Sequence, residues 1–146
     1  MNARTLRMTA VALALLAGGC LESAPAPTPL PPRASHAVTG LETATGSFTG
    51  ASGYDTRGTA SVFWTGSEWV VSLGSDFHHG GSPSPSVGLG TNGVYDPASR
   101  LGPLKAPSGE QVYPLAPGLD IGDYFQVYIW SDELSVPVGI ADLVLL

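Results

Sequence analysis

Gly and Pro residues interrupt this sequence so often from about residue 46 onward that long helices are excluded. The chain has 146 residues with 19 Gly and 13 Pro, and no long segment carries a clean 3.6-residue apolar period. Only 12% of residues are charged while 43% are hydrophobic, a balance that suits short strands joined by tight turns. We therefore predict an all-β domain, an antiparallel β-sandwich or barrel of about seven to nine short strands.

The clearest hairpin lies in the segment GTASVFWTGSEWVVSL, residues 58–73. Two runs of β-forming residues flank Gly66-Ser67, which is a turn sequence. Trp64 and Trp69 stand on either side of this turn. We interpret these two residues and Trp130 as hairpin or core packing, with an aromatic binding platform as the alternative.

The C-terminal segment alternates large and small residues over positions 136–141, which predicts another strand. Pro137 within it indicates an edge position or an exposed backbone position, because Pro has no N–H to donate. Gly139 indicates a bend or a close approach of another chain segment. The last four residues, LVLL, are apolar to the terminus, so we expect this end to be held in the core.

The first twenty residues, MNARTLRMTAVALALLAGGC, have the three parts of a secretory signal. Arg4 and Arg7 form a positive region, residues 8–17 are apolar, and the small residues Gly18-Gly19 precede Cys20. The apolar part is too short to cross a bilayer of about 30 Å. LLAGGC resembles a bacterial lipobox, so we predict a lipoprotein signal peptide over residues 1–19 and lipidation of Cys20. An ordinary signal peptide with an incidental Cys is the alternative.

Residues 20–45 then form the lipidated Cys and a Pro-rich linker. Five Pro between positions 25 and 32 exclude a helix or a central strand, and such a segment acts as an extended spacer. The β domain would occupy residues 46–146. We expect an extracytoplasmic protein, lipid-anchored to a bacterial membrane. Leu21, in place of an Asp after the Cys, favours the outer membrane if the host is Gram-negative.

The charge of the chain limits its partners. The formal net charge is −6, and cleavage before Cys20 would leave only four basic residues, Arg33, Arg57, Arg100 and Lys105. The sequence contains no basic cluster, so nucleic acid is not expected as a partner. The expected partners are the lipid bilayer, through acylated Cys20, and an unidentified envelope protein or small ligand.

The order of short motifs from residue 46 to residue 143 resembles the DM13 domain family. The matching segments are Gly46-Ser47-Phe48, Gly58-Thr59, Leu101 to Lys105, Gly109 to Tyr113, Trp130-Ser131, Leu134-Ser135-Val136 and Gly139 to Leu143. The resemblance implies an extracytoplasmic β domain with a role in electron transfer or redox chemistry. In that family a near-invariant Cys carries the role, and Ser131 stands at its position here. Ser82-Pro83-Ser84 replaces the family's Gly-Pro-Asp step.

The inventory of metal and redox ligands is short. Cys20 is the single Cys, and both Met residues, Met1 and Met8, lie in the signal. Blue-copper, iron–sulfur and c-type haem sites need Cys ligands, so they are not expected in the mature chain. His78 and His79 are weak metal candidates because adjacent strand residues point to opposite faces. We interpret them as solvated loop residues, with b-type haem or a copper or zinc contact as the alternative.

No catalytic residues are predicted. No nucleophile elbow is present in the sequence, and Asp132-Glu133 are interpreted as caps of the turn that follows them. The candidate functional site is therefore Trp130, Ser131 and Asp132. We predict an envelope lipoprotein whose domain is a non-catalytic binding or accessory module. The alternative is an electron-transfer component that uses a bound cofactor such as haem or copper.

Overall fold

A computed structural model of the chain describes residues 40–146. The predicted signal peptide, Cys20 and the linker up to residue 39 lie outside the described residues. Among those described, strands dominate and the helical part consists of two short 3₁₀ turns. The all-β prediction is confirmed.

The described residues form twelve strands, more than the predicted seven to nine, because five of them are only two residues long. The elements are β1 (Leu41–Gly50), β2 (Thr56–Arg57), β3 (Thr59–Trp64), β4 (Trp69–Leu73), β5 (His78–His79), β6 (Pro85–Thr91), β7 (Val94–Tyr95), η1 (Pro97–Ser99), β8 (Gly102–Pro103), β9 (Gln111–Pro114), η2 (Ile121–Asp123), β10 (Gln126–Ser131), β11 (Val136–Asp142) and β12 (Val144–Leu145).

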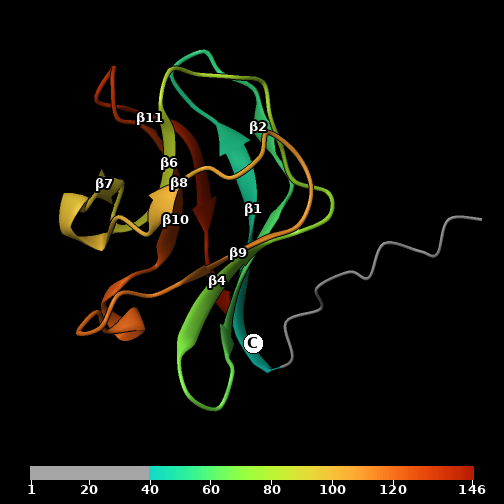
Figure 1. The fold of residues 1–146 in the computed structure, drawn as a ribbon, viewed down its shortest axis with the longest axis vertical. Helices are drawn as coiled ribbons and strands as arrows, with labels where there is room; N and C mark the ends of the chain where they lie inside the picture. Colours follow the sequence, from blue (N-terminus) through green and yellow to red (C-terminus); the bar gives the residue numbers. More distant parts are fainter. Residues whose placement is uncertain (1–39) are drawn as a thin grey trace, which may run out of the picture. The chain divides into compact units, whose positions relative to one another are not determined.

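One antiparallel sheet contains most of these strands and curls into a half-barrel (Figure 1). Its continuous path runs β7-β6-β10-β11-β1-β3-β4-β9, with β12 beside β1 and β8 beside β6. A small separate sheet pairs β2 with β5. The predicted hairpin is confirmed, since Trp64 of β3 pairs with Trp69 of β4 and their ring centroids lie 5.2 Å apart.

Strand β1 joins the two halves of the curled sheet. One edge pairs with β3 from Leu41 to Ser47. The other edge pairs first with β12, at Ala44 and Thr45, and then with β11, from Phe48 to Gly50. A strand shared in this way lets the sheet close around a core without a second layer.

The core fills the concave side of the sheet. It combines alternate residues from every long strand, as a sheet with one buried face requires. Its fully buried side chains include Val62, Val71, Leu73, Phe77, Val87, Leu89, Tyr113, Val127, Ile129 and Val138. Phe48 and Phe77 meet edge to face at 5.4 Å.

Strand β11 lies between β10 and β1, so the edge position that Pro137 indicated is wrong for the strand, although Pro137 itself lies beyond the stretch paired with β1, which ends at Gly139. The register with β10 shifts between Ile129 and Trp130, so that Pro137 sits beside a β-bulge rather than within a regular ladder. A Cβ at Gly139 would come within 2.5 Å of Cγ2 of Thr56. The predicted close approach is confirmed, and only Gly leaves room for the Thr56 side chain.

Two boundaries differ from the expectation. The sheet begins at Leu41, so residues 41–45, which the sequence placed in the linker, belong to β1. The C-terminal end is not held in the core: Val144, Leu145 and Leu146 are exposed. Strand β12 is held by backbone pairing with β1.

Candidate functional site

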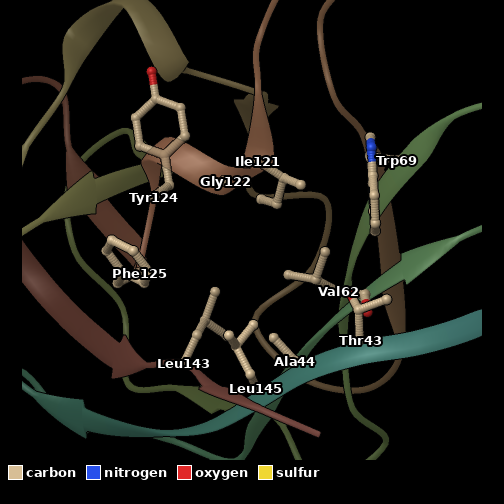
Figure 2. Close-up of a pocket in the computed structure, with 10 residues that line it drawn as sticks. All are labelled: Thr43, Ala44, Val62, Trp69, Ile121, Gly122, Tyr124, Phe125, Leu143 and Leu145. Carbon is tan, nitrogen blue, oxygen red and sulfur yellow. The ribbon is translucent and has the colours of Figure 1, made fainter.

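An apolar pocket opens at the end of the half-barrel where β1 begins (Figure 2). Its volume is about 390 Å³, within the size range of small-ligand sites. Strands β1, β3 and β4 form one wall, and η2 with the segment after it forms the other. The lining residues are Thr43, Ala44, Val62, Trp69, Ile121, Gly122, Tyr124, Phe125, Leu143 and Leu145.

The wall formed by residues 121–125 is fixed by hydrogen bonds. Asp120 caps η2 by accepting from the Gly122 N–H at 2.9 Å. The Tyr124 hydroxyl donates to Oδ2 of Asp96 at 2.7 Å, and this bond raises the pKa of Tyr124 to about 12 while it lowers the pKa of Asp96. The hydrogen bond to Asp96 holds the Tyr124 side chain in place. The pocket wall is preformed.

The interior of the pocket offers almost no polar group to a ligand. No lining side chain carries a formal charge, and the Thr43 hydroxyl already donates to the Val62 carbonyl at 3.2 Å. A site of this kind binds uncharged, apolar molecules by removing their surface from water. Sequence reasoning missed it because its residues come from five separate segments of the chain and share no motif.

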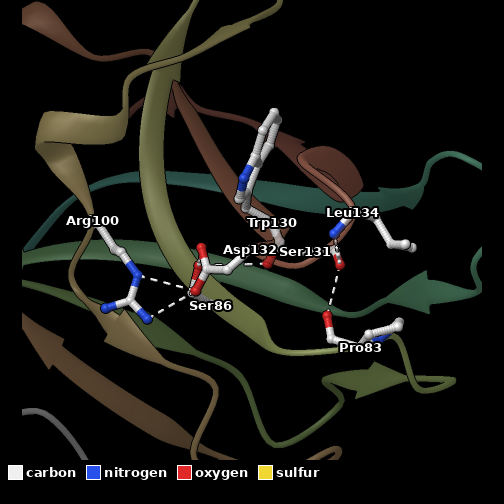
Figure 3. Close-up of polar contacts among 7 residues, drawn as sticks. All are labelled: Pro83, Ser86, Arg100, Trp130, Ser131, Asp132 and Leu134. Carbon is white, nitrogen blue, oxygen red and sulfur yellow. Dashed lines mark hydrogen bonds and ion pairs between the residues drawn. The ribbon is translucent and has the colours of Figure 1, made fainter.

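Ser131 lies at the end of β10 and is fully buried (Figure 3). Its hydroxyl donates to the Pro83 carbonyl at 2.6 Å and accepts from the Leu134 N–H at 3.3 Å. Its own carbonyl accepts from the Ser135 N–H at 2.8 Å. Ser131 thus closes the turn between β10 and β11 and fastens the 82–84 segment to it. It does not line the pocket.

Asp132 turns away from the Ser131 hydroxyl and joins a different group (Figure 3). Its Oδ2 accepts from Nε and Nη2 of Arg100 at 3.2 and 2.9 Å, and its Oδ1 accepts from the Ser86 hydroxyl at 3.0 Å. The expected role of Asp132 as a cap of the following turn is wrong. Ser131 fills that role instead, since its hydroxyl accepts from the Leu134 N–H of the turn.

Trp130 lies on the opposite face of the sheet from Ser131, because successive strand residues alternate. It stacks on Tyr95 with centroids 4.3 Å apart and planes inclined by 14°. Tyr95 in turn covers Gly88, where a Cβ would come within 2.6 Å of the Tyr95 ring. The Tyr95 hydroxyl is buried without a hydrogen-bond partner among the described residues. Burial, reinforced by Asp132, raises the pKa of Tyr95. Trp130 is therefore packed as the sequence predicted.

His79 is a buried structural residue, so the expectation of two solvated histidines is wrong for it. The Thr56 hydroxyl gives its single proton to the Val138 carbonyl at 2.8 Å and therefore accepts from Nδ1–H of His79 at 2.9 Å. The remaining nitrogen, Nε2, contacts the Ser82 hydroxyl at 2.9 Å. Both ring nitrogens are occupied, which leaves no lone pair free for a metal.

His78 points elsewhere and does not converge with His79. Its Nδ1 contacts the Ser108 hydroxyl at 2.9 Å, and its Nε2 lies 3.9 Å from Asp55. Burial and the neighbouring His78 lower the pKa of His79, with Asp55 opposing them. Within residues 40–146 no group of three or more His, Cys, Asp or Glu side chains could hold a metal ion.

Trp130, Ser131 and Asp132, which the sequence suggested as one functional site, therefore have separate structural roles. The pocket lies at the opposite end of β10, beside Phe125. The described part of the chain contains no helix of the length and apolarity that a membrane span requires. Comparison of the chain with family models, with curated proteins and with solved structures finds no match.

Proposed function

We propose that this protein is a lipid-anchored, non-catalytic binding module of the bacterial cell envelope, with a DM13-like domain that binds a small apolar ligand. The observation that carries the proposal is the pocket of about 390 Å³ with its uncharged lining. Anchoring rests on the lipobox-like LLAGGC sequence and on the Pro-rich linker that follows Cys20. The acidic chain disfavours nucleic acid as a partner.

Ligand binding is testable with the uncharged, environment-sensitive dye Nile red. Ala44 lies in the pocket wall and is 5% exposed, so Ala44→Leu places a larger side chain inside the pocket. We expect Nile red fluorescence to rise with the wild-type protein, and the affinity for the dye to fall by roughly tenfold in Ala44→Leu. Ala98→Leu is the matched control because Ala98 is exposed on η1, away from the pocket. Equal dye affinity in all three proteins would show that the pocket is not the binding site.

Anchoring is testable by fractionation of cells that express the full chain. Acyl chains bind membranes through about 0.8 kcal/mol per buried CH₂, so the wild-type protein should stay in the membrane fraction after a high-salt wash and leave it in detergent. Cys20→Ala should lose acylation, measured by labelled fatty acid, whereas Ser23→Ala should keep it. Acylation that persists in Cys20→Ala contradicts the proposal. A visible absorption band of haem or copper in the purified protein would favour the electron-transfer alternative instead.

A further inference from the structure

Five large apolar side chains face solvent on the segments that form the pocket or adjoin it. We name them the apolar rim: Leu41 (69% exposed), Trp64 (36%), Phe125 (50%), Leu145 (74%) and Leu146 (74%). A chain normally leaves such residues exposed singly, while a contiguous group marks a surface that binds a partner.

The rim and the pocket form one continuous apolar surface. Phe125 and Leu145 line the pocket and belong to the rim at the same time. Leu41 pairs with Trp64, and the Trp64 ring packs on Trp69 of the pocket wall. The Leu146 N–H donates to the Thr43 carbonyl at 3.1 Å, which holds the end of the chain beside the pocket. A partner seated on the rim therefore covers the mouth of the pocket.

The chain enters the folded domain at this rim. Strand β1 begins at Leu41, so residues 21–40 join the predicted lipid anchor at Cys20 to the rim itself. The covalent link to the predicted anchor therefore starts at the rim and not at another face of the domain.

The charges near the rim limit which partners can bind there. Glu42, Glu68, Asp120 and Asp123 lie in the segments that carry the rim and the pocket, and these segments contain no Lys or Arg. The three basic residues of the described region, Arg57, Arg100 and Lys105, contact Asp55, Asp132 and the Val112 carbonyl in other parts of the domain. Anionic headgroups are disfavoured, and so is a second copy of the same acidic chain.

We propose that the apolar rim rests in the surface of the membrane to which the protein is tethered, and that the pocket accepts an acyl chain of a zwitterionic lipid. The inference rests on the proposed function, because the tether is the acylated Cys20. Exposed apolar residues of this size embed into the boundary between headgroups and acyl chains. The pocket then opens toward hydrocarbon and not toward water.

The seating of the rim is testable with full-length lipidated protein reconstituted into phosphatidylcholine vesicles that carry bromine on the acyl chains. Bromine quenches tryptophan only at short range. Trp64 and Trp69 lie at the rim and pocket while Trp130 does not, so fluorescence should fall by about half relative to unbrominated vesicles. Leu145→Ser should remove most of this quenching. Leu134→Ser, which alters an exposed Leu in the turn after β10, should leave it unchanged.

The occupant of the pocket is testable separately. Dihexanoyl phosphatidylcholine, below its micellar concentration, should displace Nile red from the wild-type protein, and dihexanoyl phosphatidylglycerol should displace it at least several-fold less well.

Failure of the inference and failure of the proposed function are distinguishable. Flotation of the protein with the vesicles reports the tether, and Nile red binding reports the pocket. If both persist while bromine fails to quench, or while Leu145→Ser and Leu134→Ser are quenched alike, the membrane seating is wrong. If Leu145→Ser instead dissociates an oligomer in sedimentation experiments and leaves quenching intact, the rim is an interface between copies. If Nile red is not displaced by the zwitterionic lipid, the acyl-chain assignment is wrong.

Discussion

Replacement of Ser131 by Ala tests whether this residue is a structural element of the fold. The substitution removes one hydroxyl from a fully buried position and adds no atom. Two backbone groups lose their partner: the Pro83 carbonyl, held at 2.6 Å, and the Leu134 N–H, held at 3.3 Å. The turn between β10 and β11 and the 82–84 segment both depend on these contacts.

The magnitude follows from the two bonds. A buried hydrogen bond contributes about 1 kcal/mol net, and an abandoned buried partner adds a desolvation cost. The short bond to Pro83 accounts for most of the effect, because the 3.3 Å contact to Leu134 is weak. We expect Ser131→Ala to lower the free energy of unfolding by about 2 kcal/mol, which corresponds to a fall in Tm of about 8 °C for a domain of this size.

The assay is urea denaturation followed by tryptophan fluorescence, with the slope m compared between variants to confirm that the same surface unfolds. Ser131→Cys is the matched variant. Its thiol is a weaker donor than a hydroxyl, so its loss should be about 1 kcal/mol. Since position 131 is inaccessible to solvent, the introduced thiol should react with a thiol reagent only after unfolding.

Two results would refute this reasoning. A loss below about 0.5 kcal/mol in Ser131→Ala would mean that the two hydrogen bonds contribute nothing to stability. Rapid reaction of the thiol of the Ser131→Cys variant in its native state would mean that the site is an accessible pocket.

Three further predictions use the same denaturation assay. Gly139→Ala should destabilise the fold by about 1–3 kcal/mol, because its Cβ would overlap Thr56; an unchanged midpoint contradicts the close approach. The pKa of His79 in the folded state lies below the ordinary 6.5, so the unfolded chain takes up a proton at a higher pH than the folded one. The free energy of unfolding should therefore fall as pH drops below about 6.5. In His79→Gln this fall should be shallower between about pH 7 and about pH 5. Asp132→Asn should cost no more than about 1 kcal/mol because its ion pair with Arg100 is partly exposed; a larger loss would assign it a buried role.

Local chemistry explains why much of the fold was predictable. The Gly66 turn between two runs of β-forming residues specifies a hairpin without help from the rest of the chain. Gly139 indicated a close approach correctly, because a missing side chain leaves room wherever it occurs. Pro137 indicated an edge position, but β11 is an inner strand that pairs with both β10 and β1. The apolar run up to Trp130 indicated the strand before Ser131, and β10 continues one residue further, to Ser131.

The roles of individual polar side chains could not be predicted, because they depend on partners far along the chain. Ser131 binds Pro83, 48 residues away, and Asp132 binds Arg100, 32 residues away. His79 is buried because Thr56 and Ser82 satisfy both of its nitrogens. In the sequence alone, the same residues are equally consistent with a turn cap and a solvated histidine.

The sequence by itself determined the all-β class, the hairpin and the absence of Cys and Met ligands after residue 20, since these depend on composition and on neighbours along the chain. Only the tertiary structure decided where the pocket lies and which apolar residues stay outside the core. LVLL has the composition of a core strand, yet Leu145 of β12 and Leu146 after it stay exposed at the rim beside β1. Burial depends on the volume left by every other segment, and no local pattern records it.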